Sequence, residues 1–144
     1  MWATPSGPSG LRIRGERGHP VVRRALIRFA VYLRGRYEFP VRLPVYLSSR
    51  ERLLTPCGEG ASAAFWCPDD PDGKPSIRIA TGDYPSWRAE IGNRDDALAG
   101  FLGSLAHEVI HYFQWLETGD TTERGVEVRA TGMVRDYART VAHP

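Results

Sequence analysis

The segment LAHEVIHYFQWLE, Leu105–Glu117, contains two histidines and a glutamate with the spacing that metal chemistry requires. His107 and His111 are four residues apart, so on a helix their side chains lie on one face, about 6 Å from each other. Two imidazoles at that separation can bind one tetrahedral zinc ion. Glu108 is rotated by about 100° around the helix axis. It would therefore lie beside the ion as a proton acceptor and not as a third ligand.

The surroundings of this HExxH pattern argue against a chance match. The residues before and after it are mostly Leu, Ala, Val, Ile, Phe and Trp, which predicts a buried helix. Unpaired histidine and glutamate side chains in such a helix would carry a large desolvation penalty. A metal ion would satisfy all three side chains, so we predict a zinc site.

A catalytic zinc ion needs a third protein ligand and an open position for water. The extended pattern HExxHxxGxxH is absent, because Gln114 and Glu117 occupy the positions of its glycine and last histidine. Glu123 and Glu127 follow, four residues apart. We prefer Glu127 because it lies deeper in the predicted last helix, whereas an acid near the helix start can serve as a cap or dipole partner. Asp120 is the third choice.

Hydrophobic periodicity and turn signals predict the elements that position this site. A flexible segment over residues 1–18, rich in Gly, Pro and Ser, comes first. Asn93 is the predicted N-cap of the long helix that carries the histidines, and Thr121 or Thr122 can cap the last helix. The elements are a helix over 20–37, strands over 41–47, 61–66 and 76–81, a loop over 81–92, a helix to about 117, and a helix over about 122–140.

The three strands predict a small mixed sheet. The turn-rich segment between the second and third strands contains DG and favours a hairpin. Pro44 lacks a backbone N–H, which favours an edge position for strand 41–47. Strand 76–81 is then central and strand 61–66 forms the other edge. The predicted fold class is α+β, with one domain over residues 19–144.

HEVIH, followed by a glutamate on the next helix, resembles the gluzincin metallopeptidases. AAFW with the later IRIATGD resembles the edge strand of thermolysin-type enzymes and its neighbour. The resemblance covers roughly residues 41–138 and implies a zincin-like fold, with an active-site helix and then a glutamate-ligand helix. It implies zinc-dependent hydrolysis of peptide bonds with Glu108 as general base. The implied zinc ligands are His107, His111 and Glu127.

The resemblance also implies a substrate that lies extended along an unpaired strand edge. The implied substrate-binding residues are Ala63, Ala64, Phe65 and Trp66. The sequence departs from the family in two places. Ala63 occupies the position of an asparagine that often precedes AFW, and Thr131 occupies the position of an acid that often follows the glutamate ligand by four residues.

Further donors and contacts stay open at this point. Gln114 shares the face of the two histidines, and its amide either contacts a ligand or water or bonds to the backbone. Stabilisation of an oxyanion beyond the metal needs a hydrogen-bond donor. The candidates, which the sequence does not rank, are Tyr84, Tyr112, Tyr137 and His143.

Composition argues against several classes of function, nucleic-acid association among them, for which the arginines in and before the first helix are the only support. The 19 basic and 17 acidic residues leave a net charge of only +2, which argues against a nucleic-acid partner. No run approaches the roughly 20 apolar residues of a membrane span. The N-terminus lacks an apolar export signal, so we predict a cytoplasmic protein in which Cys57 and Cys67 are free thiols. A disulfide between them stays open for a protein exported by another route.

The main alternative is a zinc-containing binding or regulatory domain that keeps a gluzincin core but does not cut peptides. An enzyme that hydrolyses amides or esters of small molecules is a variant of that view. A further hypothesis is that the N-terminal segment or the C-terminal TVAHP covers the cleft and keeps the enzyme latent. The sequence indicates neither a cleavage preference nor an oligomeric state.

Overall fold

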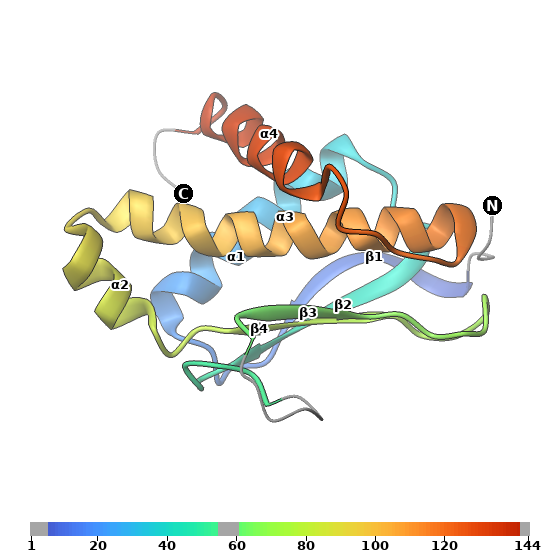
Figure 1. Cartoon of the computed structure of the whole chain (residues 1–144), viewed down its shortest axis with the longest axis horizontal. Coiled ribbons are helices and arrows are strands. Elements are labelled where there is room, and N and C mark those ends of the chain that lie inside the picture. The colour runs from blue at the N-terminus through green and yellow to red at the C-terminus, as the bar shows by residue number, and fades with distance from the viewer. Residues whose placement is uncertain (1–5, 55–60, 142–144) are drawn as a thin grey trace.

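The computed structural model describes residues 6–54 and 61–141 (Figure 1). The predicted α+β class is confirmed. Cys57 and His143 lie outside the described ranges. The elements in chain order are β1 Ser6–Arg14, α1 Pro20–Arg36, β2 Val41–Ser48, β3 Ala63–Trp66, β4 Ser76–Ala80, α2 Tyr84–Ile91, α3 Arg94–Thr118 and α4 Val126–Ala138.

The strands form one mixed sheet in the order β1-β2-β4-β3. β2 is parallel to both β1 and β4, whereas β3 is antiparallel to β4. The predicted mixed sheet is confirmed, with β4 inside the sheet and β3 at one edge. The predicted number of three strands is wrong, because the described sheet has a fourth strand, β1.

Strand β1 lies in the segment over residues 1–18 that the sequence predicts to be flexible. Its second half alternates apolar Leu11 and Ile13 with Arg12 and Arg14, which is the period-2 pattern of a strand with one buried face. Leu11 is completely buried in the core. The pattern is short and follows Gly, Pro and Ser residues, so the sequence did not predict this strand. β1 and β3 occupy opposite edges of the sheet, so β1 does not cover the edge of β3.

β1 also changes the place of β2, which the sequence predicts at an edge because of Pro44. Pro44 is paired with Arg12 of β1, and pairing with β4 begins one residue later, at Val45. Proline is tolerated there because its missing N–H lies before the start of the β2–β4 ladder. β2 is therefore an interior strand.

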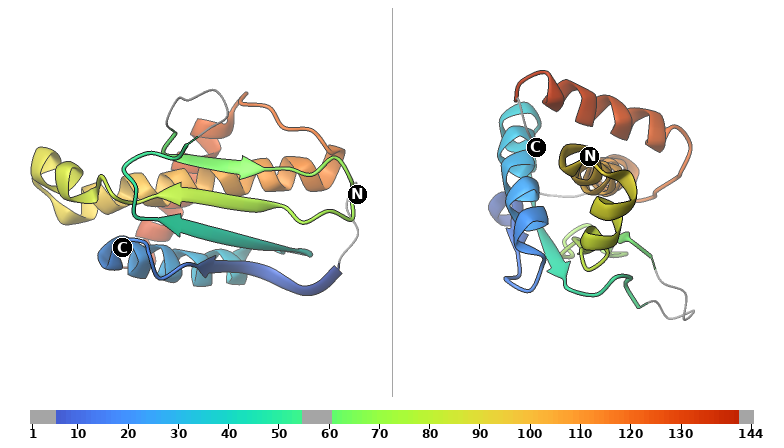
Figure 2. Two further views of the ribbon diagram at one scale, coloured as in Figure 1. Left: turned by 90° about the horizontal axis from the view of Figure 1, so that it is seen from below. Right: turned by 90° about the vertical axis from the view of Figure 1, so that its left-hand side faces the viewer.

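Helices α1, α3 and α4 lie on one face of the sheet (Figure 2). α3 runs along the sheet beside α1, and α4 crosses them on the side away from the strands. Tyr137 of α4 packs against the rings of Phe29 and Tyr32 in α1. The core fills the space between the sheet and the helices. Completely buried core side chains include Leu26, Phe29, Leu43, Val45, Ile77, Ile79, Leu105 and Val109.

α3 begins and ends where the sequence predicts. The side chain of Asn93 accepts hydrogen bonds from the backbone N–H groups of Asp95 and Asp96. Gly119 follows the last turn with a φ of 82°, a conformation that glycine adopts without strain. The helix is largely buried, as predicted. None of the helices in the described residues combines the length and apolar character that crossing a bilayer requires.

The predicted loop over 81–92 is wrong, because Tyr84–Ile91 forms α2. Pro85 lies in its first turn, where proline is compatible with a helix. Tyr84 is the only buried residue of α2. A helix with so little buried surface shows almost no apolar periodicity, so the pattern did not indicate it.

α4 begins at Val126, four residues later than predicted, and its N-cap is Gly125 and not a threonine. The residues 119–125 therefore form a loop, here the α3–α4 loop. Glu123 lies in this loop, whereas Glu127 lies in the first turn of α4. The later start of α4 therefore places the two glutamates on different elements.

Candidate metal centre

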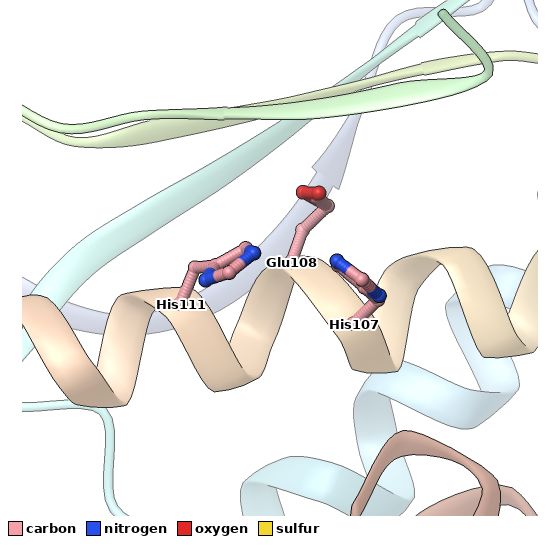
Figure 3. Close-up of side chains that lie close together, drawn as sticks. All are labelled: His107, Glu108 and His111. Atoms are coloured by element: carbon pink, nitrogen blue, oxygen red, sulfur yellow. The ribbon is translucent and has the colours of Figure 1, made fainter. Parts of the chain in front are cut away.

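His107 and His111 lie one turn apart on the same side of α3 (Figure 3). The centroids of their rings are 4.9 Å apart and the ring planes are inclined by 72°. His111 is buried, while the side chain of His107 is 20% exposed. Donor atoms of these histidines and Glu108 lie within 4.8 Å of one another. This separation is short enough for a shared metal ion.

Glu108 projects from α3 toward the sheet, beside the two imidazole rings (Figure 3). The residue is only 7% exposed, and its Oε2 has no hydrogen-bond partner among the described residues. Burial raises the pKa of this carboxyl, although His107 and His111 act in the opposite direction. An unpartnered buried oxygen is costly, so this atom is available to a bound water or ligand.

Two glutamates approach the histidines from outside α3. Oε2 of Glu123 lies 2.9 Å from Nε2 of His107, and Oε1 lies 2.8 Å from Nε2 of His111. Glu127 contacts only His107, with Oε1 2.5 Å from Nδ1. The structure thus brings both candidate glutamates to the site at different atoms. Asp120 instead contacts Thr118.

Each histidine also has a partner at Nδ1. Glu127 occupies this position at His107, and Oε1 of Gln114 lies 2.9 Å from Nδ1 of His111. A histidine that binds a metal through Nε2 carries hydrogen on Nδ1, and an oxygen acceptor at Nδ1 stabilises that form of the ring. Metal-binding histidines in proteins commonly have such outer partners.

The donor set fits a zinc ion. Two imidazole nitrogens and one carboxylate form the ligand set of known catalytic zinc sites. After burial and the histidines, the charges of Glu123 and Glu127 also influence Glu108, and both raise its pKa. A divalent cation would offset this repulsion among three carboxylates. It would also place a positive charge near the unpaired Oε2 of Glu108.

A cleft with a volume of about 430 Å³ opens beside His107, Glu108 and Glu127. A Cβ added at Gly100 or Gly103 would have no heavy atom within 4 Å, so no neighbouring element packs closely against these glycines. The walls beyond the candidate metal-binding side chains consist of small residues, which leaves room for a ligand. The lining residues are Ser62, Ala63, Gly100, Gly103, Ser104, His107, Glu108, Glu127, Ala130 and Thr131.

Strand β3 begins at this cleft, and no other described strand pairs with its outer edge. Ala63 lines the cleft, and the ring of Phe65 lies near Tyr112, with centroids 6.5 Å apart. Ala64 and Trp66 are exposed, Trp66 to 60%. Of the four predicted substrate-binding residues, only Ala63 has its side chain in the cleft wall. Because backbone groups alternate in direction along an edge strand, Phe65 can offer its N–H and C=O at the open edge, whereas those of Ala64 and Trp66 face β4.

The tyrosines suggested as oxyanion donors make their contacts elsewhere in the fold. The hydroxyl of the completely buried Tyr112 donates to the carbonyl oxygen of Val41 and accepts from its N–H. Tyr137 packs against α1, and Tyr84 packs against His19. None of the three lines the cleft. The structure therefore does not bring them to the candidate centre.

Sequence reasoning missed the bond between Gln114 and His111. The available signal was the spacing of three residues, which puts both side chains on neighbouring positions of one helix face. That spacing alone does not show whether the amide of Gln114 bonds to a ligand, to water or to the backbone. The structure adds the α3–α4 loop as the second neighbour of Gln114.

No protein-family model matches this chain, and no curated protein or solved structure matches it. The interpretation of the site therefore depends on its own geometry. The resemblance to the gluzincins depends on the HExxH segment, the later glutamates and the edge-strand sequence, and it stays a prediction.

Proposed function

We propose that this chain is a zinc-dependent metallopeptidase. The observation that carries the proposal is the convergence of two Nε2 atoms and one carboxylate beside a buried, unpartnered carboxylate oxygen. The proposed metal ligands are His107, His111 and Glu123, and the proposed general base is Glu108. A zincin-like arrangement of the active-site helix and the edge strand is part of this proposal.

Glu123 replaces Glu127 as the preferred third ligand. Glu123 contacts the Nε2 atoms of both histidines, whereas Glu127 contacts one Nδ1. With Glu123 as ligand, Glu127 follows four residues later, where the resemblance implies an acid that orients a histidine. The acid that is missing at Thr131 is then present as Glu127, which supports this assignment.

A bound zinc ion would lower the pKa of a water molecule and polarise the carbonyl group of a substrate. Glu108 would accept a proton from the attacking water through its unpartnered Oε2 and pass it to the leaving amine. The raised pKa of Glu108 suits this exchange, because the same group must act first as a base and then as an acid. Glu127 and Gln114 would hold hydrogen at the two Nδ1 atoms.

The proposed substrate is a peptide in an extended conformation. The unpaired edge of β3 offers backbone N–H and C=O groups to such a chain. A peptide there would pass along the cleft wall at Ala63 and beside Glu108. The small residues of the cleft would then accommodate one of its side chains.

The variant Glu108→Gln tests catalysis separately from metal binding. We expect it to retain zinc, measured by elemental analysis, while hydrolysis of a broad peptide library falls by about 10²–10⁴-fold. The control His111→Ala should lose both zinc and hydrolysis. Wild-type protein that binds zinc but cleaves no peptide would support the non-proteolytic domain instead. Carefully prepared protein that neither contains nor binds zinc would contradict the proposal.

A further inference from the structure

Gln114 connects the two parts of the proposed metal site. Its Oε1 lies 2.9 Å from Nδ1 of His111 and accepts a hydrogen bond of 3.0 Å from the backbone N–H of Thr122. Its Nε2 donates to the carbonyl oxygen of Thr122 at 3.0 Å. One side chain thus bonds to a proposed ligand and to the backbone of the residue before Glu123.

The backbone of Thr122 determines which way the amide points. A backbone N–H only donates and a carbonyl only accepts, so Oε1 must face the former and the NH₂ group the latter. A rotated amide would place two donors together and two acceptors together. Because Oε1 can only accept, its bond to Nδ1 of His111 requires hydrogen on Nδ1, which is the form of the ring in which Nε2 can bind a metal ion.

The same two bonds hold the α3–α4 loop. Residues 120–125 are exposed, so little apolar burial fixes this part of the loop. Its start is held by hydrogen bonds between Thr118 and Asp120, and its middle by the two bonds between Gln114 and Thr122. Loss of Gln114 would therefore release the segment immediately before Glu123. A less ordered ligand binds metal more weakly, because ordering it costs conformational entropy.

We propose that Gln114 is a positioning residue of the metal site. It stabilises the Nδ1–H form of His111 and holds the loop that carries Glu123, which prepares both groups to bind a metal ion. This inference rests on the proposed metal site and not on peptidase activity.

Zinc affinity, measured by competition with a chromophoric chelator, tests the inference. We expect Gln114→Leu to bind zinc about 10–100-fold more weakly than wild type, the usual range for outer partners of metal ligands. Gln114→Glu keeps acceptor oxygens but loses the amide donor, so its loss should be smaller. The control Glu117→Gln changes an exposed residue of the same helix and should bind like wild type. Circular dichroism confirms that each variant is folded.

Two further measurements separate the two roles. In metal-free Glu123→Ala protein at alkaline pH, where the carboxylate that faces Nε2 is removed, ¹⁵N NMR of His111 should show the Nδ1–H tautomer, and the double variant with Gln114→Leu should lose it. In a Glu123→Ala background, Gln114→Leu should weaken zinc binding less than it does in wild type, because the loop no longer supplies a ligand.

Different results would overturn the inference or its foundation. Equal zinc affinity of wild type and Gln114→Leu contradicts the positioning role alone. An unchanged His111 tautomer when Gln114→Leu is added to Glu123→Ala contradicts the first role, and an equal loss of zinc affinity from Gln114→Leu in both backgrounds contradicts the second. Wild-type protein that binds no zinc contradicts the proposed metal site itself.

Discussion

Oε1 of Glu123 lies 2.8 Å from Nε2 of His111, although the two residues are 12 positions apart and Glu123 belongs to a loop. The histidines come from one buried helix, whereas this carboxylate comes from an exposed connection. The site therefore combines a rigid pair of nitrogens with an oxygen whose position depends on the loop. This difference leads to distinct expectations for the two glutamates.

Removal of Glu123 should weaken zinc binding more than removal of Glu127. Glu127→Ala takes away an outer partner of His107, which typically costs about 10–100-fold in affinity. Glu123→Ala removes a direct ligand in our proposal, so the loss should exceed that range. Chelator competition measures both constants. The reverse order of the two variants would identify Glu127 as the ligand.

The sequence could predict the arrangement of the two histidines, because they lie on one helix and helix geometry fixes their relative positions. Once Asn93 and Gly119 define α3, residues 107 and 111 must share a face. The third ligand could not be predicted in this way. Its choice depends on where α4 begins, and the bonds between Gln114 and Thr122 occur in a loop whose path no local pattern specifies.

The sheet shows the same division between local and non-local information. The hairpin of β3 and β4 follows from a short connection, and the structure confirms it. β1 pairs with β2 across the whole of α1, so only the brief alternation at residues 11–14 indicated it. The place of β2 inside the sheet follows from that missed pairing and not from Pro44 itself.

Replacement of Gly100 by alanine should stabilise the protein. An added Cβ meets nothing within 4 Å, and alanine is the better helix former. We expect the free energy of unfolding to rise by about 0.5–1 kcal/mol in urea. Gly119→Ala is the matched control and should destabilise, because position 119 has a φ of 82°. A loss of stability in Gly100→Ala would show that the cleft wall has no room.

Replacement of Tyr112 by phenylalanine should destabilise the protein without affecting zinc affinity. The hydroxyl is bonded to both the N–H and the carbonyl oxygen of Val41, and phenylalanine would leave these buried groups unpaired. Such a change costs about 1–3 kcal/mol. Tyr46→Phe is the control, since Tyr46 is 47% exposed. Weaker zinc binding in folded Tyr112→Phe would instead connect this tyrosine to the metal site.

Tyr137 should make the stability of the protein decline at alkaline pH. The residue is 3% exposed, and burial raises the pKa of its hydroxyl, although Arg28 acts in the opposite direction. A tyrosine in the unfolded chain ionises near pH 10. Above that pH the unfolded state loses a proton that the folded state keeps. The free energy of unfolding therefore falls as the pH rises through this range.

The variant Tyr137→Phe cannot ionise at this position, so its stability should decline less steeply above about pH 10. Urea unfolding at several pH values between neutral and alkaline conditions measures the two slopes. The other tyrosines are present in both proteins, so their ionisation cancels in the difference. Parallel curves for wild type and variant would contradict the prediction, because they would mean that Tyr137 ionises equally in the folded and unfolded states.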